Sequence, residues 1–334
     1  MRVLAGDIGG TKTAMAIIEI GKTGQSVLRL ERYPSAEYPG LEDIVEEFLA
    51  SERTLPQAAG FGVAGPVRGG SARITKLPWR IEQHRLARRI GIRNVALLND
   101  FVAAAMGLPY LKPRQLTTLA RGSAEPGAPV AILGAGTGLG QAAILRVGRH
   151  YEVVPSEGGH VDFGPRNPLE DRLVVFLRRK FGRASRDRIL SGGGLVLLYE
   201  FLKADGLARE SRAVHEELEK NADRAAVISR FGLARRDRLS CAALDLFVSI
   251  YGSEAGNLAV QYRATGGVFI GGGIAPKILP ALRRPEFLAA FHDKSPMKEL
   301  LARVPVRVVL DGRLGLYGAA GAAYRTEIDT RRPS

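Results

Sequence analysis

The stretch Gly6-Asp-Ile-Gly-Gly-Thr11 follows an apolar run that starts at Val3, and residues 13–20 continue in apolar and small residues. This pattern predicts strand, turn and strand, and residues 26–33 predict a third strand, so the chain opens as a β-meander. The same form returns at Val130-Ala-Ile-Leu-Gly-Ala-Gly-Thr-Gly-Leu-Gly140, followed by a strand over residues 141–147. Thr11 and Thr137 stand in matching places. The repeat predicts an α/β protein with two related halves.

Two common phosphate-binding motifs do not fit these glycine turns. Thr11 stands where a P-loop has its second glycine before the lysine, and a strand follows where the P-loop needs a helix. The second turn has Leu139 where a dinucleotide-binding fingerprint requires glycine. A Walker-type or Rossmann site is therefore not expected.

A second decisive stretch is Asn94-Val-Ala-Leu-Leu-Asn-Asp100, an apolar run that ends in an amide and a carboxylate. It predicts a buried strand, and Phe101 to Gly107 predicts the helix that follows. Ligands of open α/β sheets bind at the carboxyl ends of strands, so Asn99 and Asp100 are candidates for a site. The alternative is that either residue only caps the helix.

The rest of the chain alternates strands and helices before it becomes mainly helical. The proline-rich segment 109–129 is the expected crossing between domains, and the run 271–273 ends a strand over 267–270. Small residues over 318–323 allow the last helix to approach another backbone closely. The expected helices cover residues 42–51, 83–90, 169–181, 194–207, 214–219, 239–263, 314–324 and a segment that starts at Pro276.

Length and composition limit the classes of protein that fit. The 334 residues suffice for two domains, and no apolar stretch of membrane-spanning length or secretory signal is found. We therefore expect a cytoplasmic protein without a membrane partner. Cys241 is the only cysteine, which excludes an intrachain disulfide and a multi-cysteine zinc site.

The formal charge of +14 raises the possibility of a nucleic-acid partner. The basic residues are spread along the chain, and neither a helix-turn-helix nor an interleaving of aromatic and basic residues is present. We therefore expect no nucleic-acid partner, an expectation that binding to a labelled duplex at physiological salt would overturn.

The glycine turns suggest phosphate chemistry. Successive backbone N–H groups in such turns form a concavity that holds phosphate oxygens, and Thr11 or Thr137 could add a hydroxyl donor. The alternative is that the glycines only make tight hairpins. Asp7 is suited to hold a hydrated Mg²⁺ beside the first turn.

Transfer of a phosphoryl group to a hydroxyl needs a base, and Asp100 is the candidate. Asn99 can donate and accept, as a polyhydroxylated acceptor requires. Glu157 and His160, joined by two glycines, could fix two further hydroxyls. Alternatively, His160 is a structural histidine and Glu157 a solvated charge.

Five motifs together resemble the bacterial glucokinases of the hexokinase, Hsp70 and actin superfamily. They are Gly6-Asp-Ile-Gly-Gly-Thr11, Leu98-Asn-Asp-Phe101, the turn of residues 134–140, Glu157-Gly-Gly-His-Val-Asp-Phe163 and Gly267-Val-Phe-Ile-Gly-Gly-Gly-Ile274. The resemblance implies two ribonuclease H-like domains flanking a cleft. The smaller would comprise residues 1–110 completed by 303–334, and the larger residues 111–302. It also implies a homodimer.

The resemblance further assigns roles to residues. Asp100 would be the base acting on the 6-hydroxyl of D-glucose, with ATP and Mg²⁺ as cofactors and glucose 6-phosphate as product. Sugar-ring contacts would come from Asn99, Glu157, His160 and Asp187. The ATP phosphates would lie on Gly6, Asp7, Ile8, Gly9, Gly10, Thr11, Gly136, Thr137 and Gly138. The adenosine would lie on Gly271, Gly272 and Gly273.

Two departures bear on sugar specificity. Asp187 stands where the family usually has glutamate, and Lys76 where asparagine is usual. A broader hexose kinase that also accepts mannose is therefore an alternative, as is polyphosphate in place of ATP. A non-catalytic sugar sensor is a further alternative. The cysteine cluster of the related ROK proteins is absent.

Overall fold

The computed structural model describes residues 1–21, 24–74, 77–148 and 150–331. The chain forms two compact units, Met1–Gln115 with Asp311–Ser334, and Leu116–Leu310. From the sequence, we expected the chain to return to the first domain at residue 303. In the structure, β14 (Val306–Val309) pairs with β13 (Gly267–Gly271) of the second unit, so residues 303–310 belong there.

The first unit is built on a five-stranded sheet in the order β3-β2-β1-β4-β8. Strands β1, β2 and β3 are antiparallel neighbours, which confirms the predicted β-meander, and β4 and β8 run parallel to β1. Their bounds are β1 (Arg2–Ile8), β2 (Lys12–Gly21), β3 (Gly24–Pro34), β4 (Ala58–Val63) and β8 (Asn94–Asn99).

Four helices and a small second sheet complete this unit. The helices are α1 (Leu41–Leu49), α2 (Gln83–Ile90), α3 (Asp100–Gly107) and α13 (Leu314–Arg331). The small sheet has the strands β5 (Val67–Arg68), β6 (Ser71–Arg73) and β7 (Arg80–Glu82). Single 3₁₀ turns are η1 (Ser35–Glu37), η2 (Leu108–Tyr110) and η3 (Pro113–Gln115).

Alternation along the strands gives the main sheet two apolar faces. Leu4 and Ile8 of β1 belong to the core that includes the apolar residues of α1 and α2. Val3 and Ala5 belong to the core that includes α13. Successive side chains of a strand point to opposite faces, so one short strand serves both layers.

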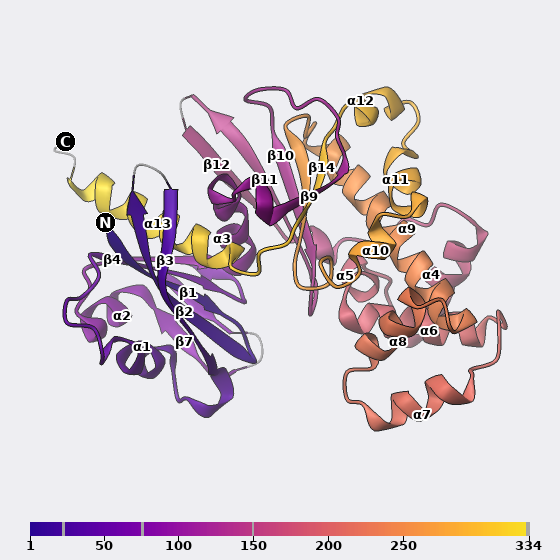
Figure 1. Cartoon of the computed structure of the whole chain (residues 1–334), viewed down its shortest axis with the longest axis horizontal. Coiled ribbons are helices and arrows are strands. Elements are labelled where there is room, and N and C mark those ends of the chain that lie inside the picture. The colour runs from indigo at the N-terminus through magenta and orange to yellow at the C-terminus, as the bar shows by residue number, and fades with distance from the viewer. Residues whose placement is uncertain (22–23, 75–76, 149, 332–334) are drawn as a thin grey trace. The chain divides into compact units, whose positions relative to one another are not determined.

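Helix α13 lies close to the backbone of β4 and α3, although some 200 residues separate it from them in the sequence (Figure 1). A Cβ at Gly60 would overlap Ala319 O, and one at Gly318 would overlap Ala103 O. The predicted role of the small residues in this helix is therefore confirmed.

The second unit repeats the strand order of the first. Its sheet runs β12-β11-β10-β13-β14-β9, with β10, β11 and β12 antiparallel and β13 and β14 parallel to β10. The remaining bounds are β9 (Leu116–Ala120), β10 (Val130–Ala135), β11 (Leu139–Val147) and β12 (His150–Ser156). The first five strands match β3-β2-β1-β4-β8, as the repeated hairpin and the resemblance to ribonuclease H-like domains predict.

A large group of helices packs with this sheet. They are α4 (Pro168–Phe181), α5 (Arg186–Ile189), α6 (Gly192–Ala204), α7 (Arg212–Lys220), α8 (Arg224–Leu233), α9 (Arg238–Gln261), α10 (Leu279–Leu282), α11 (Pro285–His292) and α12 (Lys298–Ala302). Helix α9 is buried over most of its length and carries Phe247 and Tyr251 into the core. A helix that is apolar on most sides is typical of a buried position.

The structure differs from the local predictions in two places. Strand β9, which pairs with β14, lies in the proline-rich segment and was not predicted, although the boundary between the two units does fall in this segment. The helix expected from Pro276 begins only at Leu279, because residues 272–278 form turns. In the described part of the chain, no helix has the length and apolar character that a membrane span requires.

Candidate functional site

The Asn99-Asp100 pair lies where β8 ends and α3 begins, as the sequence predicts. Asn99 Oδ1 accepts hydrogen bonds from the N–H groups of Phe101 (2.9 Å) and Val102 (3.2 Å), so it caps α3. Its amide nitrogen donates to Gly65 O at 3.2 Å. Asp100 Oδ1 accepts from Phe101 N–H at 2.8 Å. The capping role is therefore confirmed for Asn99, and both side chains are held in place at the strand end.

Asp7 lies in β1, two strands from Asp100. In the register of the sheet, Asp7 is opposite Gly62 of β4, which is opposite Leu98 of β8. A Cβ at Gly62 would lie 3.6 Å from Asp100 Cα, so this glycine lets α3 start close to the sheet. Burial, and secondarily the negative charge of Asp100, raise the pKa of Asp7 to about 6. The carboxylates of Asp7 and Asp100 are therefore close enough to repel each other.

The first glycine turn joins β1 to β2 and is held from one side by Ser35. Gly9 N–H donates to Lys12 O at 3.1 Å, which closes the turn. The Ser35 hydroxyl donates to Gly9 O at 2.8 Å, and Ser35 N–H donates to Thr11 O at 3.1 Å. Within the described ranges, no hydrogen bond is found for the N–H groups of Gly10 and Thr11. The Gly9 and Thr11 carbonyls are occupied, whereas the N–H groups of Gly10 and Thr11 remain for a ligand.

Gly6 and Ile8, like Asp7, are assigned to this turn by resemblance but lie inside β1. Gly6 pairs with Met15, and a Cβ at Gly6 would lie 2.5 Å from the Phe61 ring. Ile8 is fully buried in the core. Gly6 and Ile8 therefore serve the packing of β1, whereas Gly9, Gly10 and Thr11 form the turn itself.

The second glycine turn joins β10 to β11 and lies at the start of α6. Gly136 N–H donates to Gly138 O at 2.8 Å, and Gly192 N–H donates to Gly136 O at 2.9 Å. Thr137 and Gly138 are exposed. Helix N-termini carry unpaired N–H groups and a positive dipole end, so the first turn of α6 adds to the phosphate-binding character of this loop. This contribution was not predicted from the sequence.

The third glycine run follows β13 and is tied to the second turn. The Tyr251 hydroxyl accepts from Ala135 N–H at 3.0 Å and donates to Gly271 O at 3.4 Å. Gly272 has φ 78°, and a Cβ there would lie 2.5 Å from Ala135 O. The structure therefore brings the glycines of residues 136–138 and 271–273 to neighbouring strand ends.

Three residues predicted to bind the sugar gather in the second unit. His160 Nδ1 lies 3.6 Å from Asp187 Oδ2, and His160 Nε2 lies 3.9 Å from Glu157 Oε2. The Ser185 hydroxyl donates to Asp187 Oδ1 at 2.6 Å. The Glu157 and His160 side chains are 78% and 67% exposed, so both can meet a ligand. Asp187 is 24% exposed and is the best fixed of the three.

The two glycines between Glu157 and His160 are needed for packing. They lie in η4 (Gly158–His160), which rests on β11. A Cβ at Gly158 would overlap the Gln141 amide oxygen, and one at Gly159 would overlap Leu139 O. The Gly-Gly pair thus lets the segment lie flat on the strand.

The candidate residues fall into two sets, one in each unit. The candidates of residues 6–11, together with Asn99 and Asp100, belong to the first unit, and the other described candidates belong to the second. Lys76, the other departure from the family pattern, lies outside the described residues. Among the described residues no cluster of three or more His, Cys, Asp or Glu side chains is arranged for a metal. Asp7 and Asp100 fit Mg²⁺, which prefers one or two carboxylates with water and substrate phosphate.

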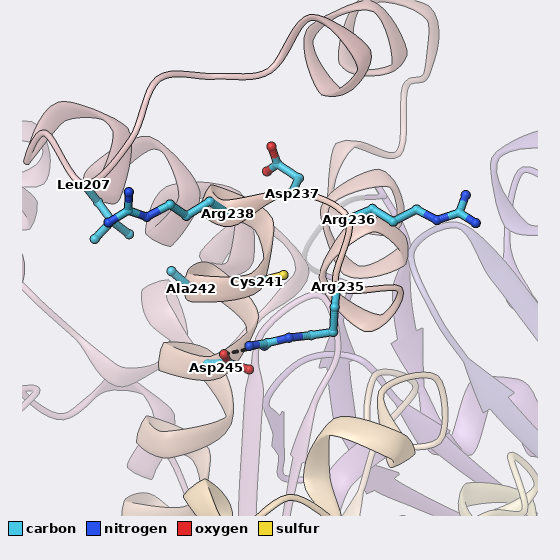
Figure 2. A pocket seen from close by; sticks show the side chains of 8 residues that line it. All are labelled: Leu207, Arg235, Arg236, Asp237, Arg238, Cys241, Ala242 and Asp245. Atoms are coloured by element: carbon cyan, nitrogen blue, oxygen red, sulfur yellow. Dashed lines mark hydrogen bonds and ion pairs between the residues drawn. The ribbon is translucent and has the colours of Figure 1, made fainter.

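An open hollow of about 470 Å³ lies elsewhere in the second unit, at the start of α9 (Figure 2). Arg235 lies in it and forms an ion pair with Asp245 at 2.6 Å. Figure 2 shows Arg236 and Arg238 pointing away from each other, so they do not converge on one ligand. None of the predicted site residues lines this hollow.

Comparison with known proteins gives a consistent result over the whole chain. The family model described as Glucokinase matches residues 4–326. A glucokinase of Nostoc sp. PCC 7120 is 43% identical over 97% of this chain and 99% of its own length. The crystal structure of a glucokinase from an Antarctic psychrotroph has a TM-score of 0.85 at 29% identity, with 97% of this chain and 99% of that chain covered.

A more distant structure has the same fold. It is a ROK family glucokinase from Streptomyces griseus in complex with glucose and AMPPNP, with a TM-score of 0.67 at 24% identity. The match covers 97% of this chain and all of that chain. Three observations point to the same family. They are the two ribonuclease H-like units, the paired glycine turns and a sequence match that covers nearly the whole chain. The chain therefore belongs to the glucokinase family.

Proposed function

We propose that this chain transfers the γ-phosphoryl group of ATP to the 6-hydroxyl of D-glucose, which gives glucose 6-phosphate and ADP. The observation that carries the proposal is the Asp100 carboxylate, held at the start of α3 beside Asp7, in a chain of the glucokinase family. The named activity of the relatives supports the same reaction.

Asp100 is the proposed general base. The sugar oxygen attacks the γ-phosphorus, the bond from phosphorus to the β,γ-bridging oxygen breaks, and the hydroxyl proton passes to Asp100. A carboxylate in the first turn of a helix is stabilised as the anion, which is the form that accepts a proton. The hydrogen bond from Phe101 N–H fixes Oδ1 and so orients the carboxyl group.

The two glycine turns are the proposed binding loops for the phosphates of ATP. Phosphoryl transfer needs positioning and charge neutralisation more than covalent chemistry, and both turns offer backbone N–H groups. The Ser35 hydroxyl fixes the first turn by its hydrogen bond to Gly9 O. The N-terminus of α6 lies at the second turn, where Gly192 N–H donates to Gly136 O. We assign the adenosine to the neighbouring run of residues 271–273.

Asp7 is the proposed ligand of Mg²⁺, through water. When bound, the ion would neutralise phosphate charge. A cation beside Asp7 would also relieve the cost of ionising this carboxylate, whose pKa is raised first by burial and then by the negative charge of Asp100.

Sugar contacts are assigned to Asn99, Glu157, His160 and Asp187. Asp187 is one methylene shorter than the usual glutamate, but the Ser185 hydroxyl and His160 hold it in place. We expect Asp187→Ala to raise the KM for glucose at least about tenfold, the worth of one lost hydrogen bond to a charged group. Equal kinetics of this variant and the wild type would remove Asp187 from the site.

Further properties implied by the family stay predictions. The duplicated sheet supports membership of the hexokinase, Hsp70 and actin superfamily. A homodimer is expected, and light scattering coupled to gel filtration would test it. A cytoplasmic location is expected from the sequence.

One assay tests the proposed activity. A panel of hexoses is incubated with ATP, other nucleoside triphosphates or polyphosphate, and sugar phosphate is detected directly. We expect glucose with ATP to give the highest kcat/KM. Comparable turnover of mannose would favour the broader hexose kinase, and turnover with polyphosphate would change the donor. Binding of sugar without any product would favour a sensor.

A further inference from the structure

A walled cavity of about 180 Å³ lies inside the second unit, away from the open hollow of Figure 2. Its polar lining comes from the segment after η4, from α5, from α9 and from the loop after α11, through Arg166, Arg186, Ser253, Glu254, Asn257 and Lys294. None of the residues assigned to sugar or nucleotide lines it. A cavity of about 150 Å³ can hold a molecule of the size of benzene, so this one has room for a small ion and water.

Both arginines of the cavity are fixed by buried carboxylates. Arg166 Nη2 lies 2.6 Å from Glu170 Oε1 and donates to Ser249 Oγ at 2.9 Å. Arg186 Nη1 lies 2.6 Å from Glu254 Oε1. Glu170 and Glu254 are almost fully buried, so the two guanidinium groups are held rigidly at the cavity wall.

The Glu254 carboxylate is already used by its neighbours. Besides Arg186, it accepts from the Gln141 amide at 2.6 Å and from the Asn257 amide at 2.9 Å. Three donors thus share its two oxygens. Its two oxygens are filled by these donors, and it attracts the further cation of the cavity only from beyond ion-pair distance.

Lys294 is that further cation. Its ammonium donates to Ser253 Oγ at 2.9 Å, and within the described ranges no carboxylate lies at ion-pair distance from it. Burial lowers the pKa of Lys294, and the positive charge of Arg166 lowers it further. Asp293, Glu254 and Glu170 act in the opposite direction. An ammonium has three donors, so two remain for a ligand. The lining itself carries three cationic side chains and one carboxylate, that of Glu254, so positive charge is in excess in this confined polar space.

We propose that this cavity binds a phosphate-class oxyanion, as inorganic phosphate or as the phosphoryl end of a small phosphate monoester. The available donors are on Lys294, on the remaining nitrogens of Arg186 and on Asn257, which lie on three separate elements. A tetrahedral ion with several acceptor oxygens meets donors from three directions better than a planar carboxylate does. In the hollow of Figure 2 the arginines diverge, so the same argument does not apply there.

Calorimetric titration of the full chain with inorganic phosphate tests the proposal. Wild type and Lys294→Gln are compared with Lys220→Gln, which removes one exposed lysine from the end of α7 in the same unit. We expect Lys294→Gln to weaken phosphate binding at least about tenfold, which corresponds to ~1.4 kcal/mol. Lys220→Gln should bind like the wild type. Equal affinities of wild type and Lys294→Gln, or no binding at millimolar phosphate, would overturn the proposal.

A second measurement needs no variant. Lysines of the wild type are acetylated at neutral pH with and without phosphate, and peptide mass spectrometry follows Lys294 and Lys220. Phosphate should slow modification of Lys294 and leave Lys220 unchanged; an unchanged rate at Lys294 would refute binding at this cavity.

Parallel titrations identify the source of the phosphoryl group. Glycerol 3-phosphate in place of phosphate would favour a monoester if it binds more tightly, and free phosphate if it binds more weakly. Acetate that binds as tightly as phosphate would contradict the assignment to this class of anion.

Discussion

Substitution of Asp7 by Asn should make the ligand-free protein more stable at neutral pH while it impairs catalysis. The pKa of Asp7 rises from its ordinary value of 3.8 to about 6, mainly through burial. The folded chain therefore holds this proton more tightly than the unfolded chain does. As the pH rises from 3.8 to 6, the wild type loses stability, because the unfolded chain has released this proton and folding must take it up again.

The size of the effect follows from the shift in pKa. A difference of about two units corresponds to about 3 kcal/mol at 1.36 kcal/mol per unit. Asparagine keeps the shape of the protonated side chain and never ionises. The gap between Asp7→Asn and wild type should be near zero below pH 4 and reach about 3 kcal/mol above pH 6.

Trp79 makes the measurement specific to one unit. It is the only tryptophan, it is buried in the core of the first unit, and its indole N–H donates to Tyr38 O at 3.1 Å. Its fluorescence during urea unfolding, without Mg²⁺ or nucleotide, reports on the unit that contains Asp7. The free energy of unfolding is compared at pH 4.5, 5.5 and 7.

The matched control is Asp43→Asn, an acid-to-amide change in α1 of the same unit. Asp43 forms an exposed ion pair with Arg89, so its loss should cost no more than ~1 kcal/mol. A gap between Asp7→Asn and wild type that does not grow with pH, or a less stable variant at pH 7, would refute the argument from burial. Unimpaired glucose phosphorylation by Asp7→Asn would separately remove Asp7 from the metal site.

Three further substitutions test the strand ends. Asp100→Asn should lower kcat at least about 100-fold with little change in the KM for glucose, and a coupled assay with near-normal turnover would contradict its role as base. Asn99→Ala removes the cap of α3 and should cost about 0.5–2 kcal/mol by Trp79 fluorescence, together with weaker glucose binding. Gly272→Ala, at φ 78° and close to Ala135 O, should destabilise the second unit by roughly 1–3 kcal/mol and raise the KM for ATP. Gly273→Ala, with open space around it, is the control by circular dichroism.

Local pattern was enough to predict the features that are close in sequence. Each glycine hairpin is a contiguous strand, turn and strand, and the Asn99-Asp100 pair follows directly on an apolar run. Their repetition predicted the duplicated sheet. The Gly-Gly pair between Glu157 and His160 likewise indicated a close approach that the structure explains.

Contacts between distant residues could not be predicted in this way. Ser35 holds the first turn across 26 positions, and the Tyr251 hydroxyl reaches Ala135 across 116. Neither residue stands in a motif, so a local pattern gives no sign of its distant partner. Strand β9 was missed for the same reason: its partner β14 is nearly 200 residues away.

The return of the chain to the first unit sets the order in which the protein can fold during synthesis. Leu116–Leu310 is continuous and can collapse as soon as it has emerged. The sheet face that carries Val3 and Ala5 must wait for α13. Some 200 residues lie between Gln115 and the start of α13, so at about 5–20 residues per second the sheet of the first unit waits on the order of 10–40 s for this helix. During that interval the earlier-made unit is the unfinished one, with an apolar face open to chaperones.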